Sequence, residues 1–255
     1  MRANPVKTKL AAGETVYGTM IFEFLSPGLP RILANSGADF ALYDLEHSGF
    51  TIEDMKTQFA LCAAVGLVPL ARPPGKAYHF TSRLLDVGAF GLLYQMVGSA
   101  EEARELVSWT RYPPTGVRGA VFGGAHDDYT GGEMAGKAVA AMDRTFVMAL
   151  IETKAGLDNV DEIMAVDGID AAHLGHADLS LSLGIPGQFD HPNLQRGIDK
   201  IVEAATKAGK PAGAMAPSLE WGQDLLNRGY RIMSYSHDMG LLGETLSTGI
   251  KALKG

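Results

Sequence analysis

The chain has 255 residues, of which 46% are hydrophobic and 20% are charged, and its formal net charge is −7. This composition is typical of a globular protein and excludes a disordered chain. A net negative charge provides no electrostatic footprint for nucleic acid and disfavours an anionic membrane surface, so we expect neither as a partner. Small anionic substrates remain open, because they need only a local cation.

Cys62 is the single cysteine, so no intrachain disulfide can form. It lies in an amphipathic helical pattern, where a small buried hydrophobe is favoured over a nucleophile. No apolar run approaches the roughly 18 residues of a membrane span. The first 13 residues lack the apolar core of a secretory signal, and we therefore expect a cytoplasmic location.

Short apolar strands alternate with helical patterns along the whole chain. The predicted strands are Val16–Phe22, Phe40–Leu45, Val68–Ala71, Gly91–Met96, Phe146–Ile151, Ile169–Leu174, Pro211–Met215 and Tyr230–Tyr235. The predicted helices are Leu29–Gly37, Ile52–Gly66, Phe80–Gly88, Ala100–Arg111, Leu157–Val166, Leu194–Gly209 and Leu219–Gly229. Several of these helices end at glycine, as helices commonly do.

Eight strands alternating with helices predict the α/β class and a parallel sheet, and eight strands close a (β/α)8 TIM barrel of about 250 residues. The alternative is a doubly wound open sheet, which usually carries a glycine-rich turn after its first strand. The sequence EFLSPGLP after the first predicted strand lacks that fingerprint. No linker interrupts the pattern, so we predict one TIM-barrel domain over residues 1–255.

Two segments interrupt the strand–helix rhythm. Residues 112–130 form a long, glycine-rich connection, and loops of this length in compact domains are often functional. Residues 239–255 have an amphipathic helical pattern. This last helix is expected either to cover the barrel or to be exchanged with another subunit.

Polar residues collect where the predicted strands end, which is where TIM barrels carry their chemistry. These residues are Asp44, Glu46, His47 and Ser48 after the second strand, Arg72 after the third, Glu152 after the fifth, His176 and Asp178 after the sixth, and Ser236, His237 and Asp238 after the eighth. Carboxylates at the ends of two consecutive buried strands are costly unless something binds them. Glu152 and Asp178 with open positions suit a hard cation such as Mg²⁺ or Mn²⁺.

Each of these residues also has a purely structural interpretation. His47 can orient a turn, Arg72 can pair with Glu46 or Glu152, and Asp178 can be a helix N-cap. Their occurrence on one predicted rim favours the functional interpretation.

Two further patterns suggest other chemistry. Residues 131–137 (GGEMAGK) have the spacing of a phosphate-binding loop, but Ala138 stands where Ser or Thr is required and no strand precedes them. We therefore do not predict a nucleotide site. Lys154 is a candidate Schiff-base lysine, although ETKAG is typical of a solvated turn.

Six segments together resemble a known family. They are YDLEHSGF, PLARPP, LLDVGAFGLLYQMV, SAEEARELVSWTRYPPTGVRG, ALIET and HLGHADLS, and they cover most of the chain in the family's order. The chain resembles the HpcH/HpaI aldolases, the metal-dependent (class II) pyruvate aldolases of the phosphoenolpyruvate-binding barrel superfamily.

The resemblance implies a role for each matched position. His47 is similar to the general base, Asp86 to the carboxylate that raises its basicity, and Arg72 to the cation that steadies the enolate. Glu152 and Asp178 correspond to the metal ligands. The pyruvate carboxylate would be received by the backbone turn Gly175, His176, Ala177 and Asp178.

The implied reaction is reversible aldol addition of pyruvate, or a close 2-oxo acid, to an aldehyde, with cleavage of a 4-hydroxy-2-oxo acid as its reverse. The implied cofactor is Mg²⁺ or Mn²⁺, with Co²⁺ or Zn²⁺ as further candidates. The implied assembly is a hexamer whose last helix packs on a neighbouring subunit.

The chain departs from the family pattern near the presumed substrate face. Leu150 replaces a frequent Gln, His176 and Gln95 each replace a usual Pro, and GGAHDDY replaces a segment that often carries arginine. We hypothesise that Gln95 or His176 supplies the polar contact that Leu150 cannot.

Three alternatives remain open at this stage. One is a lyase or decarboxylase acting on an oxaloacetate-like acid through the same enolate chemistry. Another is a Schiff-base aldolase that uses Lys154. The third is a catalytically silent barrel that only binds a metal–oxo-acid complex.

Overall fold

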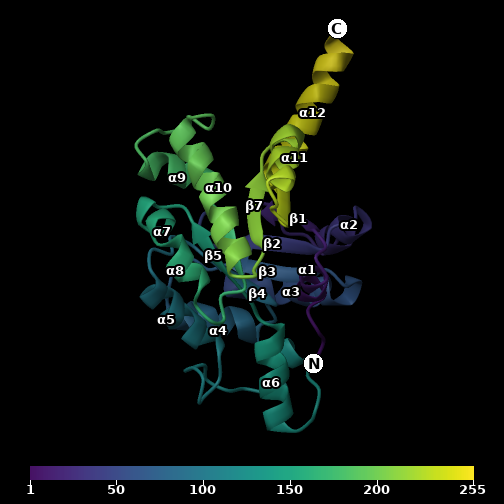
Figure 1. The fold of residues 1–255 in the computed structure, drawn as a ribbon. Coiled ribbons are helices and arrows are strands. Elements are labelled where there is room, and N and C mark those ends of the chain that lie inside the picture. The colour runs from purple at the N-terminus through teal and green to yellow at the C-terminus, as the bar shows by residue number, and fades with distance from the viewer.

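The computed structural model describes residues 1–255, and its centre is a closed barrel of eight parallel strands in sequence order (Figure 1). The strands are β1 (Val16–Ile21), β2 (Phe40–Asp44), β3 (Val68–Arg72), β4 (Gly91–Tyr94), β5 (Phe146–Ile151), β6 (Ala171–Leu174), β7 (Ala212–Ala216) and β8 (Ile232–His237). The barrel closes because β1 pairs with both β2 and β8. The predicted (β/α)8 barrel is confirmed.

Helices surround the barrel and connect its strands. They are α1 (Pro5–Ala11), α2 (Leu29–Asn35), α3 (Ile52–Val65), α4 (Tyr78–Asp86), α5 (Ala100–Thr110), α6 (Met134–Arg144), α7 (Lys154–Asp158), α8 (Val160–Met164), α9 (His176–Ser182), α10 (Pro192–Lys207), α11 (Leu219–Asn227) and α12 (Asp238–Lys254), with a 3-10 turn at Ala125–Asp127. The sequence pattern did not predict α1, α6 or α9. The predicted helix Leu157–Val166 is instead the pair α7 and α8, which meet at Asn159.

The core has two layers, one inside the barrel and one between the barrel and its helices. Strands β2 to β6 are buried at every residue, which explains their nearly continuous apolar sequence. Val6 and Leu10 of α1 belong to the inner layer, together with Phe40 and Phe146. The first helix therefore packs against the amino-terminal end of the barrel.

The glycine-rich segment 112–130 joins α5 to α6 and so leads into the beginning of β5. It lies at the end of the barrel where the strands begin, near α6 (Figure 1). Arg118 in this segment is buried and forms an ion pair with Asp86 at the end of α4. Within one chain, this connection is remote from the carboxyl ends of the strands.

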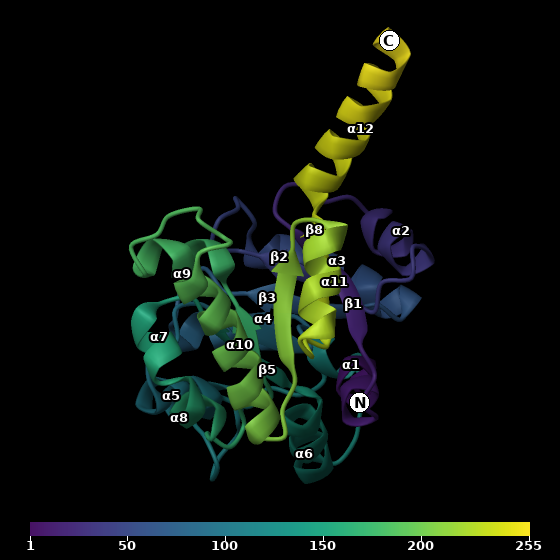
Figure 2. The ribbon, with the colours of Figure 1, turned by 45° about the horizontal axis from the view of Figure 1, so that its top comes forward.

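Helix α12 leaves the barrel after β8 and projects away from it (Figure 2). Large apolar side chains are exposed along it, namely Met239, Leu242, Leu246, Ile250 and Leu253. Such a face is expected to be covered by another chain. Exchange of this helix between subunits therefore stays a prediction. No helix in the structure is apolar over a length sufficient to cross a bilayer.

Candidate active site

A cavity of about 140 Å³ opens at the carboxyl ends of the barrel strands. It is lined by Met20, Phe22, His47, Arg72, Leu93, Leu150, Glu152, His173, Leu174, Gly175, His176, Ala177, Asp178 and Met215. Seven of the predicted site residues are in this set, while Asp86 and Gln95 are not. A larger cavity of about 460 Å³ lies beside α1 at the opposite end of the barrel, but none of the predicted site residues lines it.

Arg72 is held by two carboxylates on the neighbouring strand and its turn. It is the register partner of Asp44 across β2 and β3, and the two side chains form a buried ion pair. Its Nη1 also lies 3.2 Å from Oε2 of Glu46. Burial alone would lower the pKa of Arg72, but the hydrogen bond and the charge of Asp44 outweigh burial and raise this pKa. The guanidinium is therefore a fixed positive charge in the cavity wall.

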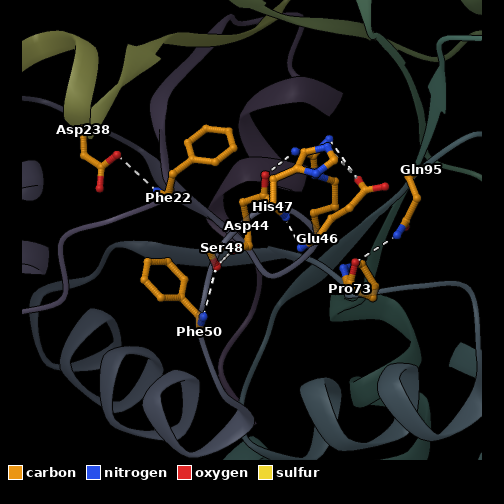
Figure 3. A network of polar contacts seen from close by, with 10 residues as sticks. Phe22, Asp44, Glu46, His47, Ser48, Phe50, Pro73, Gln95 and Asp238 are labelled. Atoms are coloured by element: carbon orange, nitrogen blue, oxygen red, sulfur yellow. Dashed lines mark hydrogen bonds and ion pairs between the residues drawn. The ribbon is translucent and has the colours of Figure 1, made fainter. Parts of the chain in front are cut away.

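Asp44 also shapes the turn that carries His47. Its Oδ1 accepts hydrogen bonds from the backbone N–H groups of Glu46 at 2.7 Å and His47 at 3.2 Å (Figure 3). The imidazole Nε2 of His47 then lies 3.7 Å from Oε2 of Glu46, and 58% of the His47 side chain is exposed. His47 thus stands at the mouth of the cavity with Glu46 as its neighbouring carboxylate.

The predicted pairing of Asp86 with His47 is not formed within the chain. Asp86 is the last residue of α4, and its Oδ1 lies 2.7 Å from Nη2 of Arg118. The nine residues of α4 run back from the end of β3 and carry Asp86 roughly 12 Å from the rim. In a single subunit, Glu46 rather than Asp86 is the carboxylate close to His47.

Gln95 follows β4 and is buried, but its Nε2 donates a hydrogen bond to the carbonyl of Pro73 at 3.0 Å (Figure 3). His176 does line the cavity, with its ring packed edge-on against Trp221 at 4.2 Å and against Phe189 at 5.2 Å. Burial lowers the pKa of His176 to about 4, so its imidazole is neutral near pH 7. The structure therefore brings only His176 of this hypothesised pair to the cavity.

The residues at the end of β8 and directly after it support the framework of the site. His237 is the N-cap of α12, and its Nδ1 accepts a hydrogen bond from Gly240 N–H. The Asp238 carboxylate accepts hydrogen bonds from Phe22, Glu23 and Phe24 N–H at 3.1, 2.9 and 2.8 Å (Figure 3 shows the first). Neither residue lines the cavity, but Asp238 fixes the segment after β1 that places Phe22 there.

Glu152 follows β5 directly and is only 3% exposed. Its Oε1 accepts a hydrogen bond from Met96 N–H at 2.7 Å. A Cβ atom on Gly175 would lie 2.5 Å from the Glu152 Cβ and 2.7 Å from its Oε2, so only glycine lets the end of β6 approach this carboxylate. The N-cap of α9 is Gly175, and Asp178 lies in its first turn, so Asp178 is not the N-cap of this helix.

The electrostatics of these acids fit a divalent cation. Burial raises the pKa of Glu152 to about 7. The negative charges of Asp178 and Glu46 also raise this pKa, whereas the hydrogen bond from Met96 N–H and the charge of Arg72 lower it. Carboxylate oxygens are the ligands that Mg²⁺ and Mn²⁺ prefer. No group of three His, Cys, Asp or Glu side chains is assembled to hold an ion. Glu152 and Asp178 are the carboxylates in the cavity lining that could hold such an ion.

The raised pKa of Glu152 predicts how the metal-free protein responds to pH. Between about pH 4.3 and pH 7 the folded chain retains a proton on Glu152 that the unfolded chain releases, so this group's contribution to stability decreases as the pH rises, by about 1 kcal/mol per unit. We expect thermal unfolding of metal-free protein to occur at a lower temperature at about pH 7 than at about pH 5.5. Glu152→Gln should reduce this difference, and an unchanged difference in that variant would contradict the assignment.

Comparison with known proteins agrees with this geometry. A family model described as HpcH/HpaI aldolase/citrate lyase matches residues 20–244. The chain belongs to this family. A 2-keto-3-deoxy-L-rhamnonate aldolase of Klebsiella pneumoniae is 37% identical over 241 residues, which are 92% of this chain and 90% of that protein. The predicted family, the lyase class and aldolase function are therefore confirmed.

Solved structures of the HpcH/HpaI family have the same fold. The HpcH/HpaI aldolase of Desulfitobacterium hafniense DCB-2 superposes with a TM-score of 0.93 at 33% identity, covering 98% of this chain and 96% of that one. A HpcH/HpaI aldolase/citrate lyase family protein of Burkholderia cenocepacia J2315 has a TM-score of 0.93 at 26% identity, covering 99% and 100%.

The sequence patterns missed several residues that line the cavity from inside the barrel, among them Met20, Leu93, His173 and Met215. Strands with both faces buried give no alternation of polar and apolar residues that would identify the inward face. The one available signal was His173, a polar residue within an otherwise apolar strand.

Proposed function

We propose that the protein is a divalent-metal-dependent aldolase that cleaves a 4-hydroxy-2-oxo acid to pyruvate and an aldehyde, with Glu152 and Asp178 as metal ligands. The observation that carries the proposal is that Glu152, Asp178, Arg72 and His47 line one cavity at the carboxyl ends of the strands. The whole chain, residues 1–255, is proposed to act as one catalytic domain.

A bound divalent cation supplies a Lewis acid that polarises the 2-oxo group and orients the acid. The chain's own residues perform the other tasks. The Gly175–Asp178 turn, which lines the cavity, would receive the carboxylate of the acid, and Arg72 would give fixed positive charge to the oxygen on which negative charge develops. His47 at the cavity mouth is suited to move the proton, because an imidazole nitrogen can accept a proton and return it.

The name of the similar Klebsiella pneumoniae aldolase gives one candidate substrate, 2-keto-3-deoxy-L-rhamnonate. We infer that a 2-keto-3-deoxy sugar acid is the class to test first, with pyruvate as the shared product. A lyase or decarboxylase acting on an oxaloacetate-like acid is the second candidate, since the same cation, Arg72 and turn would bind it. Analysis of the products by mass separates these reactions.

The Schiff-base alternative finds less support. The Lys154 side chain is 64% exposed, and its Nζ lies 2.5 Å from Asp158 Oδ2. It does not line the cavity. A buried, desolvated amine is the usual condition for a nucleophilic lysine, and Lys154 lacks it.

We further propose a homo-oligomer, with the hexamer of the family as the specific expectation. The exposed apolar residues of α12 support association through that helix. The cytoplasmic location stays a prediction, as does the choice among Mg²⁺, Mn²⁺, Co²⁺ and Zn²⁺.

The test is a cleavage assay on 2-keto-3-deoxy-L-rhamnonate before and after treatment with chelator. We expect pyruvate release to stop in metal-free protein and to return with Mg²⁺ or Mn²⁺, whereas borohydride with pyruvate should trap no covalent adduct. Full activity in chelator, or an adduct on Lys154, would overturn the metal-dependent mechanism.

A further inference from the structure

The inner wall of the cavity contains one polar side chain that the proposed mechanism does not use. His173 lies on β6, where its register partners are Leu150 on β5 and Gly213 on β7. Both His173 and Leu150 line the cavity, together with Arg72 and Glu152. Below the rim, the surrounding strand residues of the cavity are apolar, namely Met20, Leu93 and Met215. His173 is thus the polar group in an otherwise apolar floor.

The barrel is built to accommodate this imidazole. Gly213 lies next to it on β7, and a Cβ atom there would come within 3.0 Å of Cδ2 of His173 and 2.9 Å of Cβ of Ile232. A side chain at position 213 would therefore displace the ring. Glycine at this inward-facing position leaves the space that His173 occupies.

The imidazole nitrogens have no hydrogen-bond partner. His173 is 2% exposed, and neither Nδ1 nor Nε2 is hydrogen-bonded within the chain. The backbone of Leu174 lies close to the ring and acts to raise its pKa, but the contact does not reach hydrogen-bond geometry. Leaving two polar atoms buried and unpaired lowers stability, so a site with this feature needs another reason for it.

The protonation state defines what the ring can bind. Burial, together with the nearby charge of Arg72, lowers the pKa of His173 to about 3. Near pH 7 the ring is neutral, with one N–H donor and one nitrogen acceptor. Such a group can donate a hydrogen bond to an anionic oxygen without adding a charge to the cavity.

We propose that His173 is a substrate-binding residue, whose buried ring turns toward the cavity and donates a hydrogen bond to an oxygen of the 2-oxo acid. Leu150, its register partner across β5 and β6, has no polar group that could make this hydrogen bond. Neither Gln95, which is bonded to Pro73, nor His176, which packs on Trp221, is required for it. The inference rests on the proposed function, because it needs the oxo acid to be bound beside Arg72 and Glu152.

The test measures binding of oxalate, an unreactive anion with the planar oxygen edge of a 2-oxo acid, to Mn²⁺-loaded protein by calorimetry. His173→Leu and His173→Phe remove the nitrogens, and His79→Leu on the exposed first turn of α4 is the matched control. We expect either folded variant to bind oxalate about tenfold or more weakly than wild type, since the lost hydrogen bond is to a charged group. The KM for pyruvate should rise with it, with a smaller change in kcat, while Mn²⁺ affinity and the His79→Leu variant stay within about twofold.

Oxalate affinity within about twofold of wild type in a variant that melts cooperatively would overturn the proposal. A lower melting temperature with unchanged oxalate binding would also overturn the proposal, since His173 would then have only a structural role, such as a hydrogen bond to a buried water. The proposed function fails in a different way, when wild-type protein itself shows no Mn²⁺-dependent binding of oxalate. Calorimetry on wild type therefore separates the two failures.

Discussion

Replacing Glu152 by glutamine is expected to lower kcat/KM for the cleavage reaction by about 10³ and to weaken Mn²⁺ binding by more than about tenfold. A Lewis acid contributes several kcal/mol of stabilisation where charge develops, and each 1.4 kcal/mol corresponds to a factor of ten in rate. Glu152 is buried at the end of β5 and is the acid whose pKa is raised to about 7. Cleavage kinetics and Mn²⁺ titration measure the two effects.

The fold should survive this change. Glutamine retains the shape of the side chain and an oxygen that can accept the hydrogen bond from Met96 N–H. It also removes a carboxylate that is costly to ionise when buried, so metal-free Glu152→Gln should be at least as stable as metal-free wild type near pH 7. Low activity in a variant of undiminished stability is the specific signature of a lost ligand.

The matched control is Glu162→Gln, which makes the same chemical change at an exposed position of α8. Its activity and Mn²⁺ affinity should equal those of wild type. Wild-type metal affinity in Glu152→Gln would remove Glu152 from the ligand set and leave the cation without its proposed site.

The architecture could be predicted because its signal is repeated along the chain. Fully buried strands such as β2 and β5 are apolar at nearly every residue, and the helix after β2 ends at Gly66, whose φ is 75°. Helix α6 was missed because it is preceded by the long glycine-rich connection. Helix α9 was missed because it is short and follows β6 after one residue.

The rim was also predictable, because consecutive parallel strands bring their ends to one face of the barrel. Glu152 and Asp178 needed only that rule. The position of Asp86 did not follow from it, since the length of α4 decides at which end of the barrel its last residue lies. His173 is the one polar residue of β6, but it was missed because the sequence of a strand buried on both faces does not show which side chains point inward.

Arg72 is the second position where one substitution should have a large effect, and here stability and activity should both fall. Arg72→Ala leaves Asp44, whose side chain is fully buried, and Glu46 without their cation. Removing one partner of a buried ion pair typically costs about 3–5 kcal/mol, because the remaining charge is uncompensated. We expect that loss in the free energy of unfolding near pH 7, measured by denaturant titration, and a fall of at least about 10² in kcat/KM.

Arg72→Lys separates the two roles of the guanidinium. Lysine retains the positive charge, so much of the stability should return, but its ammonium cannot contact both carboxylates and a substrate oxygen with the fixed geometry of a planar fork. We therefore expect Arg72→Lys to unfold closer to wild type than to Arg72→Ala while kcat remains at least about tenfold low. Arg31→Lys on the exposed face of α2 is the matched control and should change neither quantity. If Arg72→Lys recovered full kcat, a point charge would suffice for the reaction, and the geometry imposed by Asp44 and Glu46 would have only a structural role.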